Sequence, residues 1–326
     1  MHDVIRLHDP RTDPESVLYR PPGLEPMSLQ HFLAKLLKPR AQLLAPWLPE
    51  RGLAMIYGPR GLGKTHLALG VAYAVASGGR LCGWSAQKAK KVLYIDGEMP
   101  AVALQERLRS INGNAPIGDC EAHLSILSDD MSPDGLPDLS TAPGQAFYTR
   151  VADGFDLVVI DNLSSLARTG IENDAESWGS IQQWSIAQRR AGRSVLFVHH
   201  AGKGGQQRGT SRREDVLDTV VALRKPDDYD PEAGCRFALH FEKARGFAGA
   251  DAAPIEAWLE SGGFNWRPLS DARADEIHAM RADGMTVRDV VVSEIEHTCN
   301  WHFQTYARRE IQPVGANRYR IREGAA

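Results

Sequence analysis

The feature that most constrains the fold of this chain is the octapeptide GPRGLGKT at residues 58–65. It matches the pattern G-x-x-x-x-G-K-[ST] in full. It directly follows the apolar run Leu53–Tyr57, and it opens a stretch with helical character. A strand, a glycine-rich turn and a helix in this order form a phosphate cradle, because the N–H groups of the turn and the positive end of the helix dipole face the anion. If a glycine-rich turn matched this pattern by chance, no apolar strand would be expected before it and no helix after it.

The octapeptide predicts that the chain binds ATP together with Mg²⁺. In loops of this type the lysine, here Lys64, contacts the β- and γ-phosphates, and the hydroxyl of the next residue, Thr65, binds Mg²⁺. The predicted nucleotide-binding residues are Gly58, Pro59, Arg60, Gly61, Leu62, Gly63, Lys64, Thr65 and His66.

Apolar runs and helical patterns alternate along the middle of the chain. The predicted strands of this part are Leu53–Tyr57, Val92–Asp96, Leu124–Leu127, Leu157–Asp161 and Ser194–His199. The predicted helices are Lys64–Ser77, Val102–Ile111, Gly144–Ala152 and Ala175–Ala191. Short apolar strands separated by helices predict an α/β fold, with a mostly parallel sheet flanked by helices on both faces. The next two expected strands, Val216–Leu223 and Arg236–Phe241, have no clear helix between them, which predicts antiparallel strands at one edge of the sheet. Phe264–Trp266 is a candidate for a last short strand.

The two ends differ in composition from this core. Residues 1–26 are polar and rich in proline, which predicts an extended arm, and Ser28 is a candidate cap for an amphipathic helix that reaches Leu37. Beyond Pro268 we expect a small, mainly helical region, either a helix-turn-helix module or a packing and oligomerisation tail. The predicted organisation is an arm and linker helix at 1–45, an ATPase domain at 46–268 and the helical region at 269–326.

Charge and composition exclude several classes of protein. The formal net charge of −3 is unlike that of a polycation, so binding to nucleic acid must come from local patches. No apolar run approaches the roughly 18 residues of a membrane span. The 4 cysteines lie far apart and form no C-x-x-C pair. We therefore expect a reduced, cytoplasmic protein with no membrane partner.

Two strand ends supply acidic candidates for the chemistry of ATP. Asp161 ends the apolar run LVVID, where ligands bind in open α/β sheets, and is predicted to hold Mg²⁺ through a water. The next residue is Asn162, so the acid that activates the attacking water must come from elsewhere. The segment YIDGEMP supplies it, with Glu98 as the predicted catalytic base and Asp96 as the weaker candidate. The alternative is that both are solvated turn acids.

A histidine pair ends another predicted strand and leads into a basic, glycine-rich segment. His199 and His200 are placed to contact the γ-phosphate and sense its hydrolysis. A metal-binding pair or a structural pair are the alternatives. The segment that follows suits a DNA backbone, and its predicted DNA-binding residues are Lys203, Arg208, Arg212 and Arg213.

The segments GPRGLGKT, YIDGEM, LVVIDNL and VHHAGKGG together resemble the RecA-fold hexameric replicative helicases of the plasmid RepA type, over about residues 45–267. The resemblance implies an ATP-hydrolysing homo-oligomeric ring that translocates along single-stranded DNA in plasmid or phage replication, with nucleotide held between subunits. In such rings a neighbouring subunit supplies a cation to the γ-phosphate. The segment FEKARG is similar to the strand end that does so in related helicases, which assigns this role to Lys243 and Arg245, with Arg208 as the alternative. An ordinary surface ion pair would also explain these residues.

Other functions remain open at this point. A RecA-fold regulatory DNA-binding ATPase would hydrolyse ATP without unwinding DNA. A metabolic P-loop kinase is disfavoured because no substrate-binding lid is recognisable. His297, Cys299 and His302 have the look of metal ligands, but no fourth ligand lies near them in the sequence.

Overall fold

The computed structural model describes residues 26–112, 120–168, 175–201, 215–226, 228–230, 232, 234–260 and 263–269, and the backbone of two strands at 311–315 and 318–321. The chain divides into two units, residues 1–41 and residues 42–326. In the first unit, Ser28 caps helix α1 (Leu29–Ala34) and accepts the N–H of His31 at 3.3 Å. The helix ends earlier than predicted, because Lys35 is extended and Pro39 cannot continue a helix.

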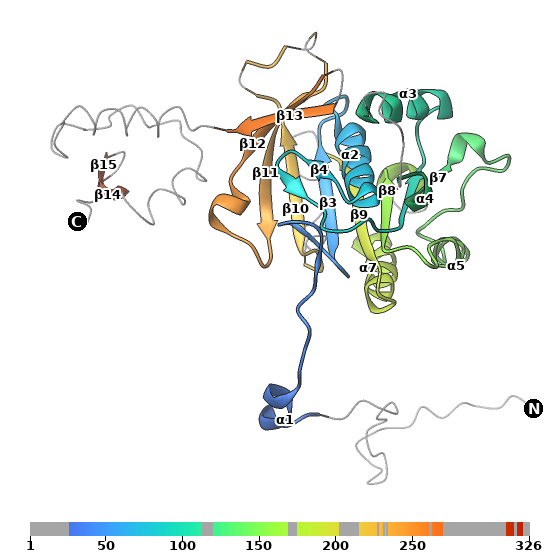
Figure 1. Cartoon of the computed structure of the whole chain (residues 1–326), viewed down its shortest axis with the longest axis horizontal. Coiled ribbons are helices and arrows are strands. Elements are labelled where there is room, and N and C mark those ends of the chain that lie inside the picture. Colours follow the sequence, from blue (N-terminus) through green and yellow to red (C-terminus); the bar gives the residue numbers. More distant parts are fainter. Residues whose placement is uncertain are drawn as a thin grey trace, which may run out of the picture. The chain divides into compact units, whose positions relative to one another are not determined.

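The second unit is built on a nine-stranded sheet in the order β13-β12-β11-β10-β3-β9-β8-β6-β7 (Figure 1). Its parallel strands are β3 (Leu53–Gly58), β6 (Val92–Asp96), β7 (Leu124–Ser128), β8 (Leu157–Asp161), β9 (Ser194–His200) and β10 (Thr219–Arg224). Its antiparallel strands are β11 (Arg236–Ala244), β12 (Ile255–Glu260) and β13 (Gly263–Pro268). The predicted fold class, a mostly parallel sheet with antiparallel strands at one edge, is confirmed.

One strand direction differs from the prediction. The first of the two strands expected to be antiparallel, β10, runs parallel to β3, and the antiparallel part begins only with β11. The start of β10 is fixed beside the start of β3, because the Asp218 carboxylate accepts the N–H of Leu53 at 2.9 Å. The same carboxylate pairs with Arg189 at 2.7 Å.

Helices cover both faces of the sheet, as the continuous apolar strands predicted (Figure 1). Side chains alternate along β3, so Ala54 and Ile56 pack with helix α2 (Lys64–Ser77), whereas Leu53 and Met55 belong to the core of the other face. That other core includes residues of α5 (Ala142–Val151), α6 (Leu163–Leu166) and α7 (Ala175–Arg190). The α2 face also holds residues of α3 (Ala101–Asn112) and α4 (Cys120–His123). The smaller elements of this unit are β1 (Gln42–Leu44), β2 (Leu48–Pro49), β4 (Arg80–Leu81), β5 (Trp84–Ser85), η1 (Asp129–Met131) and η4 (Gly249–Ala252).

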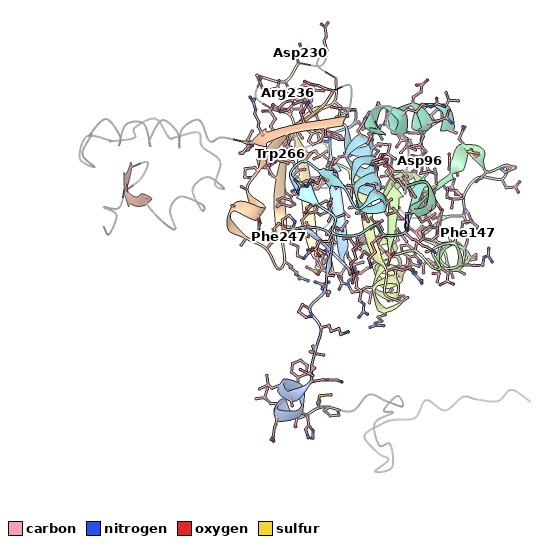
Figure 2. The ribbon with its side chains drawn as sticks, in the orientation of Figure 1. Asp96, Phe147, Asp230, Arg236, Phe247 and Trp266 are labelled. Carbon is pink, nitrogen blue, oxygen red and sulfur yellow. The ribbon has the colours of Figure 1, made fainter. Side chains whose placement is uncertain are left out.

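Strand β12 was not predicted, because a charged residue interrupts its apolar pattern. Glu256 is buried within it, and its two carboxylate oxygens accept Arg236 Nε at 2.6 Å and Arg267 Nε at 2.7 Å. Figure 2 labels Arg236 on β11 and Trp266 on β13, the two strands that flank β12. A buried carboxylate is stable inside a sheet when two guanidinium groups pair with it in this way.

Little of the C-terminal region lies within the described residues. Strand β15 (Arg318–Ile321) contains the predicted strand at 319–321 and pairs with β14 (Ile311–Gly315). The predicted helices at 274–282, 286–292 and 301–309, and the candidate metal ligands His297, Cys299 and His302, lie outside them. In the part of the chain that is described, none of the helices has the length and apolar character needed to cross a membrane.

Candidate nucleotide site

The glycine-rich loop joins β3 to α2, as the sequence predicted, and two of its glycines are required by their surroundings. At Gly58 a Cβ would lie 2.8 Å from the carbonyl oxygen of Leu223 on β10. At Gly63 the backbone has φ of +101°, and a Cβ would lie 2.3 Å from Cys235 Sγ. The loop therefore packs closely against β10 and against the residues at the start of β11.

Lys64 begins α2 and folds back into the loop. Its side chain is buried, and Nζ donates to the carbonyl oxygen of Pro59 at 2.7 Å. Burial lowers the pKa of the ammonium to about 8, although the negative charges of Asp161 and Glu98 oppose the shift. A phosphate placed in the loop would supply the negative charge that this buried cation lacks.

Asp161 ends β8 on the face of the sheet that α2 covers. Its carboxylate accepts the Tyr94 hydroxyl at 2.5 Å and hydrogen-bonds the side chain of Thr65. Burial raises the pKa of Asp161, whereas the hydrogen bonds from Tyr94 and Thr65 and the charge of Lys64 lower it. The carboxylate is thus desolvated but held by two hydroxyl groups.

Asp96 lies beside Asp161, since the two residues are register partners on β6 and β8. Its Oδ1 accepts the backbone N–H groups of Glu98 at 3.3 Å and Met99 at 2.8 Å, which holds the turn that follows the strand. Burial raises the pKa of Asp96 to about 6. Its buried Oδ2 has no hydrogen-bond partner among the described residues. Asp96 therefore shapes the turn that presents Glu98.

Glu98 stands at the mouth of the site with 57% of its side chain exposed. Its Oε2 accepts the side-chain amide of Asn162 and lies 3.6 Å from His200 Nε2. Just beyond Glu98, Asp130 Oδ2 accepts the N–H of Ala101 at 2.9 Å and so caps the start of α3. The turn that carries Glu98 is fixed at both ends.

The two histidines occupy different faces of the sheet. His200 is the register partner of Gly58, the first residue of the loop, and His199 is the partner of Tyr57. Because side chains alternate along β9, His200 lies on the same face as Asp161, whereas His199 lies on the other. Burial lowers the pKa of His200, and the charge of Lys64 adds to this shift, while Glu98 opposes it.

Lys243 and Arg245 lie toward the amino-terminal ends of the parallel strands, whereas the loop lies at their carboxyl-terminal ends. Lys243 pairs with Val220 of β10, which pairs with Met55 of β3, three residues before Gly58. The N–H of Arg245 donates to the Asp218 carbonyl, and its guanidinium donates to the carbonyl of Asp215 at 3.0 Å. The structure therefore does not bring these two residues to the loop of their own chain. The predicted DNA-binding residues Lys203, Arg208, Arg212 and Arg213 lie outside the described residues.

Sequence reasoning missed three polar residues of the site. The Tyr94 hydroxyl donates to Asp161, and the Asn162 side-chain amide donates to Glu98. The Asp130 carboxylate accepts the N–H of Ala101, in the segment that follows Glu98. Tyr94 had a recognisable signal, because it is the one hydroxyl-bearing side chain in the run VLYID and precedes Asp96 by two residues, on the same face. The other two contacts depend on how loops pack.

The donor set fits Mg²⁺. The Thr65 hydroxyl and the Asp161 carboxylate are in contact, and the unpartnered oxygen of Asp96 is buried next to them in register. Magnesium prefers oxygen ligands, and in nucleotide sites it takes one or two carboxylates, waters and phosphate oxygens. Over the residues that the structure describes, no group of three or more His, Cys, Asp or Glu side chains forms a protein-only metal cage. When bound, Mg²⁺ would neutralise phosphate charge.

Comparison with known proteins agrees with this geometry. The site and sheet together define a RecA-like P-loop ATPase. A family described as "AAA domain" matches residues 20–206, more than half of the chain, and the chain belongs to that family. Among solved structures, it is similar to the KaiC-like protein PH0186 from the hyperthermophilic archaeon Pyrococcus horikoshii OT3. The match has a TM-score of 0.50 and 15% sequence identity, and it covers 71% of this chain and 99% of that chain, which shows a shared fold.

Proposed function

We propose that this chain is an ATP-hydrolysing, RepA-like replicative helicase that translocates along single-stranded DNA in plasmid or phage replication. The main observation is the position of His200. Its Nε2 lies 3.6 Å from Glu98 Oε2, its backbone pairs with Gly58, and it immediately precedes the segment that holds Lys203 and the three basic residues after it. DNA bound to that segment would act on the hydrolytic site through a single residue.

The residues of one chain supply most of the hydrolytic chemistry. Glu98 accepts the proton of the water that attacks the γ-phosphate, and His200 senses that phosphate. Lys64 neutralises charge on the β- and γ-phosphates, while Thr65 and Asp161 hold Mg²⁺. The proximity of these side chains supports the roles: Glu98 Oε2 lies 3.6 Å from His200 Nε2, Asp161 hydrogen-bonds Thr65, and Asp161 and Glu98 both act on the charge of Lys64.

A neighbouring subunit would supply the remaining cation. We assign Lys243 and Arg245 to this role, with Arg208 as the alternative, and we propose a hexameric ring. The placement of Lys243 and Arg245 away from their own loop supports an action in trans. Helix α1 and the residues after it expose large apolar side chains that would pack on the neighbour: Leu29, Phe32, Leu33, Leu36 and Leu37.

The test of the proposal is ATP turnover with and without single-stranded DNA, together with unwinding of a forked duplex. We expect DNA to stimulate turnover and the protein to unwind the fork. Lys64→Ala should abolish both activities, and Glu98→Gln should retain ATP binding but slow turnover by about 10²-fold or more. Turnover that ignores DNA, with no unwinding, would replace the helicase with a regulatory ATPase.

The DNA-binding segment has its own test. Replacement of Lys203, Arg208, Arg212 and Arg213 together should flatten the dependence of single-stranded DNA affinity on salt, because fewer counterions are released. An unchanged affinity and salt slope would move the DNA site elsewhere.

The ring is tested by mixing two inactive variants. Chains with Lys64→Ala and chains with Arg245→Ala should regain some activity when mixed, since certain interfaces then pair an intact loop with an intact cation. Full turnover by a dilute monomer would contradict the ring and the helicase mechanism with it.

A further inference from the structure

We propose that Asn162 is a positioning residue that holds the Glu98 carboxylate in place for catalysis. It directly follows Asp161 at the end of β8, and it is buried, with 3% of its surface exposed. Its Oδ1 accepts the N–H of Ser165 at 3.0 Å, and its Nδ2 donates to Glu98 Oε2. The inference rests on the proposed role of Glu98 as the general base.

The hydrogen bond from the Ser165 N–H to Asn162 Oδ1 determines which group of the amide faces Glu98. Asn162 is the N-cap of α6, and its extended backbone, with φ of −116° and ψ of 167°, is that of a capping residue. The cap commits the side-chain oxygen to the helix, so the opposite branch of the amide must be the NH₂ group. A reversed amide would set its oxygen against a carboxylate and leave the helix N–H without its cap. The helix therefore forces Asn162 to present a donor to Glu98.

Glu98 needs such a donor. Its side chain is 57% exposed, and an exposed carboxylate is free to sample several rotamers. Asn162 and His200 both approach Oε2, whereas Oε1 accepts no hydrogen bond from any described residue. One oxygen is thus anchored and the other is left to receive a proton. The charged or titratable groups near Glu98 are Lys64, Asp96, Asp161 and His200.

The competing explanation is that Asn162 only caps α6. Two substitutions separate the roles, because serine and aspartate are both good N-caps. Asn162→Ser keeps the cap but is too short to reach Glu98. Asn162→Asp keeps the cap and reaches Glu98, but opposes it with a second carboxylate.

The experiment measures turnover, affinity for a fluorescent ATP analogue and the melting temperature of the full-length protein. Misplacing a catalytic group by about 1 Å costs up to about 10²-fold in rate. We expect kcat to fall about tenfold in Asn162→Ser, with analogue affinity and melting temperature unchanged, and about 10²-fold in Asn162→Asp. Wild-type kcat in both variants would show that the residue is only a cap and would overturn the proposal.

A double-mutant cycle with Glu98→Gln completes the test. If Asn162 acts through Glu98, Asn162→Ser should cost nothing further in the Glu98→Gln background. Equal losses in both backgrounds would overturn the positioning role. Normal turnover in Glu98→Gln would refute the role of Glu98 as the general base. Slow turnover in Glu98→Gln together with normal turnover in both Asn162 variants would refute only the positioning role of Asn162.

Discussion

Gly63→Ala tests how closely the phosphate-binding loop is fitted to strand β11. The new Cβ would lie 2.3 Å from Cys235 Sγ and 3.4 Å from the Phe237 ring, where 3.4 Å is the beginning of ordinary contact. The thiol or the loop must therefore move by about 1 Å. The backbone also has φ of +101°, and an L-residue in a left-handed conformation costs about 1–2 kcal/mol.

The two contributions have different sizes and can be separated. A 1 Å displacement of phosphate-binding groups costs about 10²-fold in turnover, and strain of 1–2 kcal/mol is a factor of about 5–30. We expect Gly63→Ala to lower kcat/KM for ATP by at least about 10²-fold. The double variant Gly63→Ala/Cys235→Ala should recover about 10²-fold of this loss, because the obstructing sulfur is gone and only the strain remains.

The assay is steady-state ATP hydrolysis, with thermal unfolding to establish that each variant is folded. Cys235→Ala alone is the matched control and should stay within about twofold of wild type, since the sulfur has no catalytic role. If removing the sulfur recovers none of the activity lost in Gly63→Ala, the steric reasoning is wrong. Wild-type activity in Gly63→Ala would refute both contributions.

Three further predictions concern other contacts of the site. Tyr94→Phe removes the 2.5 Å hydrogen bond to Asp161, and a hydrogen bond to a charged group is worth about 1.5–3 kcal/mol. The Mg²⁺ concentration for half-maximal turnover should therefore rise about tenfold or more. An unchanged magnesium titration would show that the Thr65 hydroxyl alone is enough to hold the Asp161 carboxylate. Asp130→Ala removes the cap of α3 and should lower unfolding stability by about 1 kcal/mol and slow turnover, whereas Asp130→Asn, which keeps an acceptor, should do neither. Burial raises the pKa of the Cys82 and Cys235 thiols to about 12. Iodoacetamide should therefore label both thiols slowly in the native protein at pH 8, and about tenfold faster for each added pH unit, as measured by peptide mapping. Rapid labelling at pH 8 would contradict the burial of these thiols.

The sequence predicted the parts of the fold that depend on local pattern. Strands such as Leu157–Asp161 are continuous apolar runs, and their carboxyl ends meet at one edge of a parallel sheet. For that reason Asp96 and Asp161, far apart in sequence, could be expected near the phosphate-binding loop, and they are register partners. The antiparallel edge followed from the absence of helices between the last strands.

Features that depend on distant partners could not be predicted. The start of β10 is held beside the start of β3 by a hydrogen bond between the Leu53 N–H and the Asp218 carboxylate, and these two residues are 165 positions apart. Strand β12 was missed because the partners that make Glu256 tolerable lie on two other strands. The role of Asn162 depends on α6, which at four residues is too short to show a helical period.

The position of Arg245 has a consequence for how the chains of the proposed ring would meet. Its backbone lies level with Leu53, about 16 Å along β3 from Gly58, and two strands to the side, so its guanidinium cannot reach the loop of its own chain. A two-fold dimer buries the same surface patch of both chains in a shared interface. If Arg245 completes the nucleotide site of the next chain in the proposed ring, the chains meet head to tail, with the surface that carries Arg245 on one chain against the surface that carries the loop on the next. Such a contact leaves an unmatched surface at each end of every open oligomer, and the rotation per subunit alone then decides between a closed circle and a helical filament.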